Sequence, residues 1–322
     1  MKKYIIVLIS LSFQLYGIVE DSILPLMETV YSQCCGVGNN TNLKDWKQYA
    51  IQNQQKKLRI MTFNMLYNVK NAEDKLPLKH RWLYRKPRLL EYLAHTKADI
   101  ICSQELQEDQ VEELMDFLGR NYSYYGLKTR GNEGRTDTNA IFFNAYRFDL
   151  MDAKTIPYND PGGNAFTYCY FRDRLLNKNF IVVNTKLSWG ISSGAMKKRF
   201  SEATQLNQFT SLLSADEPIL VMGDFNILRF FDEESIIKVL TKNNLKDAKT
   251  QSIFGHFGPF CSITNSSIIF TPFTGPELKG YILDRIFVNE LVWVLTHAID
   301  TAKVNGEFPS DHFPVIADIF FK

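Results

Sequence analysis

The sequence predicts an α/β fold on two observations. Mainly apolar runs with the length of buried strands occur at 58–63, 98–103 and 219–222, and a polar residue follows each of them within two positions. Segments 81–95 and 108–118 instead carry apolar side chains three and four residues apart, the spacing of a helix that buries one face. Strands and helices that alternate in this way are typical of α/β proteins. A chain of 322 residues, 45% apolar, is long enough for one large domain or for two.

The same two patterns predict the remaining elements. Strands are expected at 122–127, 139–144, 166–171, 180–184, 281–288 and 315–320, and the third and fourth of these form a hairpin. Helices are expected at 195–213 and at 232–241, where Asp232 is the N-terminal cap. Segments 131–138 and 302–308 are expected to be loops.

The N-terminal segment has the layout of a secretory signal peptide. Lys2 and Lys3 precede an apolar run at 5–13, and the small residue Gly17 follows. The run is too short for a transmembrane helix, and the alternative is an apolar N-terminal strand or helix. We expect a signal peptide at 1–17 and a secreted or periplasmic protein. The cleavage site stays open, as does retention of the segment as an anchor.

The rest of the chain divides into a leader and a folded domain. Residues 18–57 are expected to form an irregular or loosely helical leader, and the domain is expected to cover 58–322. The low, odd count of five Cys predicts no disulfide framework, because adjacent Cys34 and Cys35 cannot close an ordinary loop with each other. Cys102 is expected in the core. A formal net charge of +2 is too weak to argue for nucleic acid or for a membrane surface.

One strand end carries a strong signal for chemistry. The apolar run 219–222 stops at Gly223, where glycine permits a sharp exit from a sheet. Asp224 and Asn226 follow two residues apart, so on an extended chain their side chains point the same way. Burying them is costly unless they bond something. Either they cap a turn, or they hold a catalytic water and a metal-bound anion.

Comparable polar groups stand at other strand ends. The whole set comprises Asn64, Glu105, Lys186, Asp224, Asn226, Asp311 and His312. Carboxylate and amide oxygens without a Cys–His pair favour Mg²⁺ or Mn²⁺ over Zn²⁺. His312, beside Asp311, adds a group that titrates near neutral pH. A metal, a positioned water and a cation are the parts that hydrolysis of a phosphate ester requires.

Seven segments resemble, in order along the chain, the motifs of the endonuclease/exonuclease/phosphatase superfamily. They are Thr62–Asn64, Ser103–Glu105, Asp137–Phe142, Asn184–Leu187, Gly223–Asn226, Leu283–Phe287 and Ser310–Val315. This superfamily includes deoxyribonuclease I, neutral sphingomyelinases, AP endonucleases, deadenylases and inositol-phosphate 5-phosphatases. The resemblance covers 58–322 and implies a four-layer α/β/β/α sandwich, deoxyribonuclease I-like, with the loops of both sheets meeting at one cleft.

The resemblance also implies a metal site. Glu105 would be the main ligand of Mg²⁺ (or Mn²⁺), helped by Asn64 and Asp311. Asp137, at the position of a family Glu, would orient a ligand. The structural alternatives are that Glu105 is a solvated charge at a strand end and that Asp311 with His312 only fixes the last strand.

The same resemblance implies catalytic roles. Asp224 would orient or deprotonate the attacking water, and Asn226 would bind the scissile phosphate. His312 would contact the phosphate and stabilise its charge. Asp284 would support a catalytic partner or a metal-bound water; the alternative is that it pairs with its neighbour Arg285.

Lys186 departs from the superfamily pattern. Most of its phosphodiesterases and phosphatases carry Asn-Thr-His-Leu where this chain has Asn184–Leu187, and that His is usually a proton donor or hydrogen-bond partner at the phosphate. A lysine keeps a donor and a positive charge, but it shuttles a proton near pH 7 only where burial lowers its pKa. We favour Lys186 as an electrostatic clamp on the transition state and on the bound substrate. The alternatives are a slower or re-purposed enzyme and a protein that binds a phosphorylated ligand without cleaving it.

The sequence indicates the type of bond cleaved, a phosphate ester, more clearly than the molecule that carries it. We favour a nucleic-acid phosphodiester cleaved by a monomer, over a lipid head group such as sphingomyelin or a phosphoinositide. Segment 252–275 has no charged residue among 24 positions but five Phe. Exposed, these rings would contact a membrane or stack on nucleobases, whereas buried they would only fill the core. A binding module without catalysis is the third hypothesis.

Overall fold

The computed structural model describes residues 41–69, 72, 74–130, 136–159, 163–228, 231–263 and 281–322. The chain divides into two compact units, Met1–Gln55 and Lys56–Lys322. The described residues of the first unit form the helix α3 (Thr41–Gln52), in a leader expected to be irregular or loosely helical. The 3-10 turn η1 (Gln54–Lys56) follows α3. The predicted signal peptide at 1–17 and the Cys34–Cys35 pair lie outside the described residues.

Two β-sheets form the centre of the second unit. The seven-stranded sheet has the order β12 (His256–Phe257), β14 (Val292–Ile299), β15 (Val315–Phe321), β1 (Leu58–Asn64), β2 (Ile100–Gln104), β6 (Ile141–Asn144), β3 (Tyr122–Tyr125). The six-stranded sheet has the order β11 (Lys246–Asp247), β13 (Asp284–Val288), β10 (Ile219–Asp224), β9 (Lys178–Lys186), β8 (Ala165–Asp173), β7 (Phe148–Pro157). A separate hairpin pairs β4 (Lys128–Arg130) with β5 (Thr136–Thr138).

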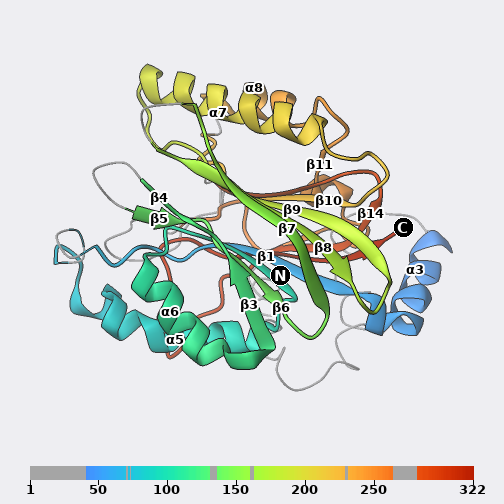
Figure 1. Ribbon diagram of the computed structural model, residues 1–322. Helices are drawn as coiled ribbons and strands as arrows, with labels where there is room; N and C mark the ends of the chain where they lie inside the picture. The colour runs from blue at the N-terminus through green and yellow to red at the C-terminus, as the bar shows by residue number, and fades with distance from the viewer. Residues whose placement is uncertain are drawn as a thin grey trace, which may run out of the picture. The chain divides into compact units, whose positions relative to one another are not determined.

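Helices cover the outer faces of both sheets (Figure 1). The pair α5 (Trp82–Thr96) and α6 (Glu108–Leu118) packs on the seven-stranded sheet, and the pair α7 (Ser193–Ser211) and α8 (Glu233–Leu240) packs on the six-stranded sheet. The short helices are η2 (Leu78–His80), η3 (Gly119–Asn121) and α9 (Ala248–Gln251). The layers therefore run helix, sheet, sheet, helix, which confirms the predicted α/β/β/α sandwich.

Alternation of side chains along the central strands builds these layers, because successive residues of a strand point to opposite faces. On β1, Ile60 packs between the two sheets and Met61 packs under α5 and α6. On β10, Leu220 packs between the sheets and Val221 packs under α7 and α8. Since both faces of these strands are buried, their sequences are mainly apolar rather than strictly alternating.

Most predicted elements are present with displaced ends, and the predicted helix at 108–118 has the bounds of α6. Two long strands, β7 and β14, were not predicted, nor were the short strands β4, β11 and β12, and β5 lies in the segment expected to be a loop. Asp232 stands before α8, but its side chain makes no cap hydrogen bond, so the predicted capping is wrong. Its Oδ2 instead accepts from Arg199 Nε at 2.7 Å, because a buried guanidinium binds a carboxylate more strongly than a neutral N–H does.

One edge of the two sheets collects the polar strand ends. Because β1 and β2 are parallel, Asn64 lies beside Gln104. Because β9 and β10 are parallel, Asp224 lies beside Lys186. Strand β13 is antiparallel to β10, and its first residue, Asp284, also pairs with Asp224. Open α/β sheets bind ligands at such carboxyl ends of parallel strands.

The described residues answer two further questions that the sequence raised. Cys102, Cys169 and Cys261 are buried free thiols, as expected for Cys102. Across the described ranges, the helices are all too short or too polar to cross a bilayer.

Candidate active site

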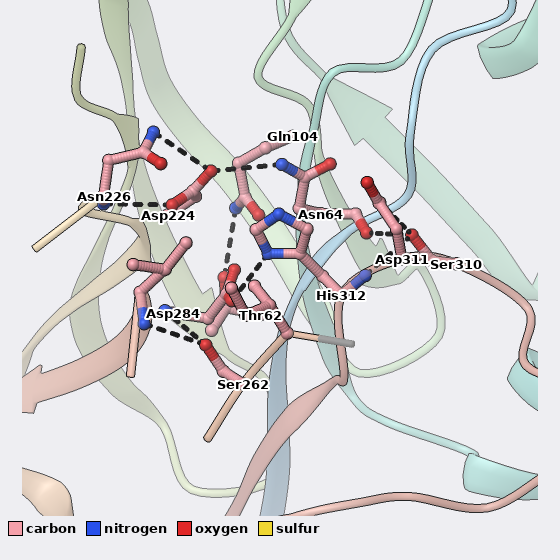
Figure 2. A network of polar contacts seen from close by, with 12 residues as sticks. Thr62, Asn64, Gln104, Asp224, Asn226, Ser262, Asp284, Ser310, Asp311 and His312 are labelled. Carbon is pink, nitrogen blue, oxygen red and sulfur yellow. Dashed lines mark hydrogen bonds and ion pairs between the residues drawn. The ribbon is translucent and has the colours of Figure 1, made fainter. Parts of the chain in front are cut away.

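The polar strand ends form a network of side chains that face one another (Figure 2). In it, Asn64 is bonded to Asp224, and His312 is bonded to Asp284. Asp311 joins through Ser310, whose Oγ donates to the Asn64 carbonyl at 2.7 Å and lies 3.3 Å from Asp311 Oδ1. The structure thus brings together the site residues that the sequence predicted. Asp137 is the exception, because its side chain lies outside the described part of the chain.

Glu105 is held by donors from both sheets. Its Oε1 is 3.0 Å from Asn64 Nδ2 and 2.9 Å from Lys186 Nζ. Its backbone is left-handed (φ 67°), a conformation that a non-glycine residue keeps only where its surroundings impose it. Burial would raise the pKa of Glu105, but the Lys186 ammonium and the Asn64 amide lower it to about 2. Glu105 is therefore an anion at neutral pH.

Asp224 is fixed by two donors at the end of β10. Asn64 Nδ2 donates to Oδ2 at 3.1 Å, and the backbone N–H of Asn226 donates to Oδ1 at 3.0 Å. Burial, and next the nearby Asp284 carboxylate, raise the pKa of Asp224 to about 6. A carboxylate with this pKa gains and loses a proton near neutral pH, as a general base must.

The turn that the sequence left open as an alternative is also present. Asn226 adopts φ 51° and donates from Nδ2 to the Leu187 carbonyl at 2.8 Å and to Asp224 Oδ2 at 3.3 Å. Its amide hydrogens are engaged within the protein, so in this structure Asn226 orients Asp224. Gly223 lets the chain approach β9, since a Cβ there would lie 2.0 Å from the Thr185 carbonyl oxygen. The turn at 223–226 therefore holds Asp224 in place within the polar site, so the turn and the site occur together.

His312 pairs with Asp284 rather than with its neighbour Asp311. Its Nδ1 is 2.8 Å from Asp284 Oδ2, and both residues are buried. Burial alone would lower the pKa of His312, but the Asp284 carboxylate raises it to about 10. The ring is therefore an imidazolium at neutral pH. Burial raises the pKa of Asp311.

The alternative pairing of Asp284 with Arg285 is wrong. Arg285 binds Asp247 at 2.8 Å and also binds Glu233. Neighbouring residues of β13 point to opposite faces of the sheet, which separates Arg285 from Asp284.

An oxygen-rich donor set at this edge fits a divalent cation. Asp224, Asp284 and His312 each bring one side-chain atom to within 4.8 Å of the others, and because His312 is an imidazolium, only the two carboxylates of this cluster offer lone pairs to a cation. Asp284 Oδ1 is buried without a hydrogen-bond partner among the described residues, and a bound cation would satisfy it. The ligands predicted from the sequence are Glu105, Asn64 and Asp311. Asn64 directs its Nδ2 hydrogens at Glu105 and Asp224, while its Oδ1 accepts the N–H of Leu66 at 3.1 Å, so this amide would have to turn to present its oxygen to a cation. Carboxylate and amide oxygens suit a hard cation.

Several buried polar residues that support the site were not predicted. Gln104 Nε2 donates to Asn184 Oδ1 at 2.7 Å, a bond between the two sheets. Ser262 Oγ accepts the backbone N–H groups of Leu283 and Asp284 at 2.9 and 3.0 Å. A polar amide at the end of a buried strand was a usable signal for Gln104. Ser262 had none, because its partners lie 21 and 22 residues along the chain.

Comparison with known families agrees with this geometry. A model of the Endonuclease/Exonuclease/phosphatase family matches residues 61–312. The chain belongs to this family. The matched range includes every site residue predicted from the sequence, from Asn64 to His312.

The chain also resembles individual members of the family. Protein angel of Drosophila melanogaster is 27% identical over 195 residues, which cover 53% of this chain and 52% of that protein. The CCR4-Not complex 3'-5'-exoribonuclease subunit Ccr4 of Neurospora crassa is 21% identical over an alignment 367 residues long. This alignment covers 83% of this chain and 46% of that protein. The chain spans about half the length of these curated relatives.

A solved structure shows the same fold. The mannosyl-6-phosphatase of Bacteroides thetaiotaomicron superposes with a TM-score of 0.68 at 19% identity and covers 82% of this chain and 100% of that one. At this level of identity, the likeness establishes the fold and leaves the substrate open.

Proposed function

We propose that this protein hydrolyses phosphodiesters, with nucleic acid as the substrate, by metal-assisted attack of water. One observation carries the proposal: Asp224, with a pKa of about 6, is fixed by Asn64 and Asn226 beside the imidazolium of His312. A base that titrates near neutrality next to a fixed cation is what hydrolysis of a phosphate ester needs. The name of the Neurospora relative, an exoribonuclease subunit, supports nucleic acid.

The metal and the base have separate tasks. A Mg²⁺ (or Mn²⁺) ion held by Glu105, Asn64 and Asp311 would act as a Lewis acid that neutralises the phosphoryl oxygens. Asp224 orients the attacking water and accepts its proton as the water oxygen bonds to phosphorus. The bond from phosphorus to one ester oxygen breaks, and that oxygen leaves and takes up a proton from solvent. Asn226 holds the Asp224 carboxylate in place through the backbone N–H bond at 3.0 Å. For Asn226 also to bind the scissile phosphate, its longer amide contact to Asp224, 3.3 Å, would have to open.

Two cations oppose the charge that develops on the phosphate. His312 is held by Asp284 through Nδ1, which leaves the opposite ring nitrogen to donate to the phosphate. Lys186 stands beside Asp224 at the adjacent strand end, where its ammonium serves as the electrostatic clamp. A lysine that stays charged supplies this electrostatic stabilisation without transferring a proton.

An exposed tryptophan on the loop that follows Lys186 supports nucleic acid. Trp189 follows Lys186 by three residues and is 58% exposed. Arg199 fixes its loop by donating from Nη1 to the carbonyls of Ser188 and Gly190 at 2.6 and 3.1 Å. An aromatic ring on a fixed loop can stack on a nucleobase at little entropic cost.

The lipid head-group alternative rests on the Phe-rich segment 252–275. Phe260 is 51% exposed, whereas Phe254 and Phe257 are partly buried, and residues 264–280 lie outside the described ranges. Among the three Phe of this segment that the structure describes, membrane contact has one exposed ring to support it, and nucleic acid is the better-supported substrate.

Export and a monomeric state complete the proposal. The supporting feature for export is the basic-then-apolar segment at 1–17. N-terminal sequencing of protein recovered outside the cytoplasm would test it, and an intact Met1 would contradict cleavage. Light scattering of the purified protein would test the monomer.

A substrate screen tests the enzyme. Purified protein is incubated with Mg²⁺ or Mn²⁺ and, in separate reactions, with RNA, DNA, sphingomyelin and inositol phosphates. We expect turnover of a nucleic acid and its loss in Glu105→Ala and Asp224→Ala, both checked for folding by circular dichroism. Activity that survives both substitutions contradicts the mechanism. Folded protein that binds but turns over none of these substrates supports a binding module instead.

A further inference from the structure

We propose that Lys186 is the resident cation of Glu105 and that a divalent ion reaches this carboxylate only by displacing the Lys186 ammonium. The chain would then carry a built-in competitor for its own metal. This inference rests on the proposed function only in requiring that a divalent metal binds at Glu105.

The geometry places the ammonium where a cation would bind. Lys186 Nζ is 2.9 Å from Glu105 Oε1, and Asn64 Nδ2 is 3.0 Å from the same oxygen. With two donors on this oxygen, a metal ion must replace one of them to bind there. A metal ion at the other carboxylate oxygen would still lie close to the ammonium, and like charges at such distances repel strongly where water is scarce.

The surrounding charges explain why a resident cation is needed. Four carboxylates belong to the site, namely Glu105, Asp224, Asp284 and Asp311. The imidazolium of His312 is bonded to Asp284. Of the two cations that stabilise the Glu105 carboxylate, Lys186 has the larger effect and is in direct contact with it, and the Glu105 side chain is only 13% exposed. A carboxylate this far from water is costly to leave unpaired, so Lys186 stabilises the metal-free protein.

An exposed pair elsewhere in the chain provides the contrast. Lys128 Nζ lies 3.1 Å from Glu108 Oε2, with side chains 51% and 67% exposed. Its separation resembles that of Lys186 and Glu105, whose side chains are 14% and 13% exposed. Solvent screens the exposed pair, so removing Lys128 changes little. Burial, and not the presence of an ion pair, is what makes Lys186 compete with a metal.

Displacement would also give Lys186 its second task. Lys186 and Asp224 are register partners at the ends of β9 and β10, so a released ammonium remains beside the catalytic carboxylate. Metal entry would move the ammonium from Glu105 towards the substrate phosphate. The clamp would then form only in the metal-loaded protein.

Calorimetric titration with Mn²⁺ alone, on full-length protein stripped with EDTA, tests the competition without any substrate. We expect Lys186→Met to bind Mn²⁺ at least about tenfold more tightly than the wild type, the scale of one partly buried charge interaction. Lys128→Met is the matched control, and Lys186→Arg keeps a cation. Both are expected to bind Mn²⁺ like the wild type. Equal or weaker binding by Lys186→Met would overturn the inference.

Two further measurements separate competition at Glu105 from an indirect effect of the substitution. In EDTA, Lys186→Met should melt at a lower temperature than the wild type, and Mn²⁺ should raise its melting temperature by more. The double variant Glu105→Gln/Lys186→Met should lose the tighter binding, and a gain that persists there would place the metal elsewhere and refute the proposal. If Lys186→Met does not fold, Lys186→Gln replaces it with the same expectations.

The outcome is independent of catalysis. If the protein turns over no phosphodiester but shows these Mn²⁺ affinities, the proposal about Lys186 holds and the proposed function is wrong. If the protein is an active phosphodiesterase but substitution of Lys186 leaves its Mn²⁺ affinity unchanged, the proposed function holds and the proposal about Lys186 is wrong.

Discussion

The site contains two carboxylate–base pairs that differ in how firmly they are held. Glu105 meets Lys186 at 2.9 Å with 13% of its side chain exposed, whereas Asp284 meets His312 at 2.8 Å and is fully buried. The Lys186 ammonium, on a flexible side chain, is able to move away from Glu105. If the His312 imidazolium moved away from Asp284, it would leave a fully buried carboxylate without a counter-charge. The first pair is therefore exchangeable and the second is fixed. Asp224 adjoins both pairs.

Removing the residue between the pairs should have the largest effect. Asp224→Ala deletes the base but leaves both pairs in place, and we expect kcat to fall by about 10²–10⁴-fold. The measurement is kcat on the nucleic acid identified by the screen. A loss below about tenfold would show that another group accepts the proton. The two pairs would then not flank the catalytic base, and their comparison would have no bearing on catalysis.

Breaking the fixed pair should come next. In Asp284→Asn the carboxylate that raises the pKa of His312 to about 10 is gone, so that pKa should fall towards its ordinary value. The positive charge is then partly lost at neutral pH, and we expect kcat to fall by about 10–100-fold, with the alkaline limb of the pH–rate profile moving to lower pH.

Nuclear magnetic resonance titration of His312 reads this change directly. Asp247→Asn is the matched control, because it removes the carboxylate that binds Arg285 on the same strand. An unchanged His312 pKa in Asp284→Asn would show that other carboxylates hold the proton and that the pair is not fixed by Asp284.

The two pairs should also lose stability on opposite sides of neutrality. The pKa of Glu105 is lowered from 4.5 to about 2, so its contribution is full above pH 4.5 and is lost as pH falls through this range. The pKa of His312 is raised from 6.5 to about 10, so its contribution is full below pH 6.5 and is lost as pH rises to about 10.

Urea unfolding of the metal-free protein, compared with Glu105→Gln and His312→Gln, measures both contributions. The difference in the free energy of unfolding between wild type and Glu105→Gln should shrink towards acid pH. The difference for His312→Gln should shrink towards alkaline pH. If both differences shrink on the same side of neutrality, the protonation of the two pairs is coupled and they do not act as separate ion pairs.

Local pattern was enough to find three of the four residues of the two pairs, and the family resemblance supplied the fourth, Asp284. Glu105 and Lys186 stand at the ends of buried, mainly apolar strands, where a charged residue is visible in the sequence. That Lys186 is bonded to Glu105, and His312 to Asp284, depends on how the strands of two sheets are aligned. Only the register of the sheets fixes such pairs, and no local pattern encodes it.

A weak local pattern explains why β7 was missed, whereas β14 was missed although its sequence is mainly apolar. Only one residue of β7 is buried, so its sequence lacks both the apolar run and the alternation that reveal a strand. The Gln104–Asn184 bond joins residues 80 positions apart on different sheets. The resemblance to the family supplied the sandwich and the roles, whereas burial and pairing came only from the structure.

The smallest predicted effect concerns Ser262, which supports the fixed pair alone. Its buried Oγ accepts the N–H groups of Leu283 and Asp284 at 2.9 and 3.0 Å, so Ser262→Ala leaves two buried donors unpaired. We expect the free energy of unfolding to fall by about 1–3 kcal/mol. The pKa of His312 should fall as Asp284 shifts, while Mn²⁺ affinity stays within about twofold because Glu105 and Lys186 are untouched.

Ser252→Ala is the matched control for this variant, since Ser252 lies in the same segment and donates to the carbonyls of Gly255 and Leu295 at 2.7 and 3.1 Å. It should cost some stability but leave the pKa of His312 unchanged. If Ser262→Ala lowers stability without moving that pKa, Ser262 only joins the segment to β13 and does not position Asp284. If it weakens Mn²⁺ binding as strongly as it moves the pKa of His312, the exchangeable and fixed pairs share one support, and the distinction between them fails.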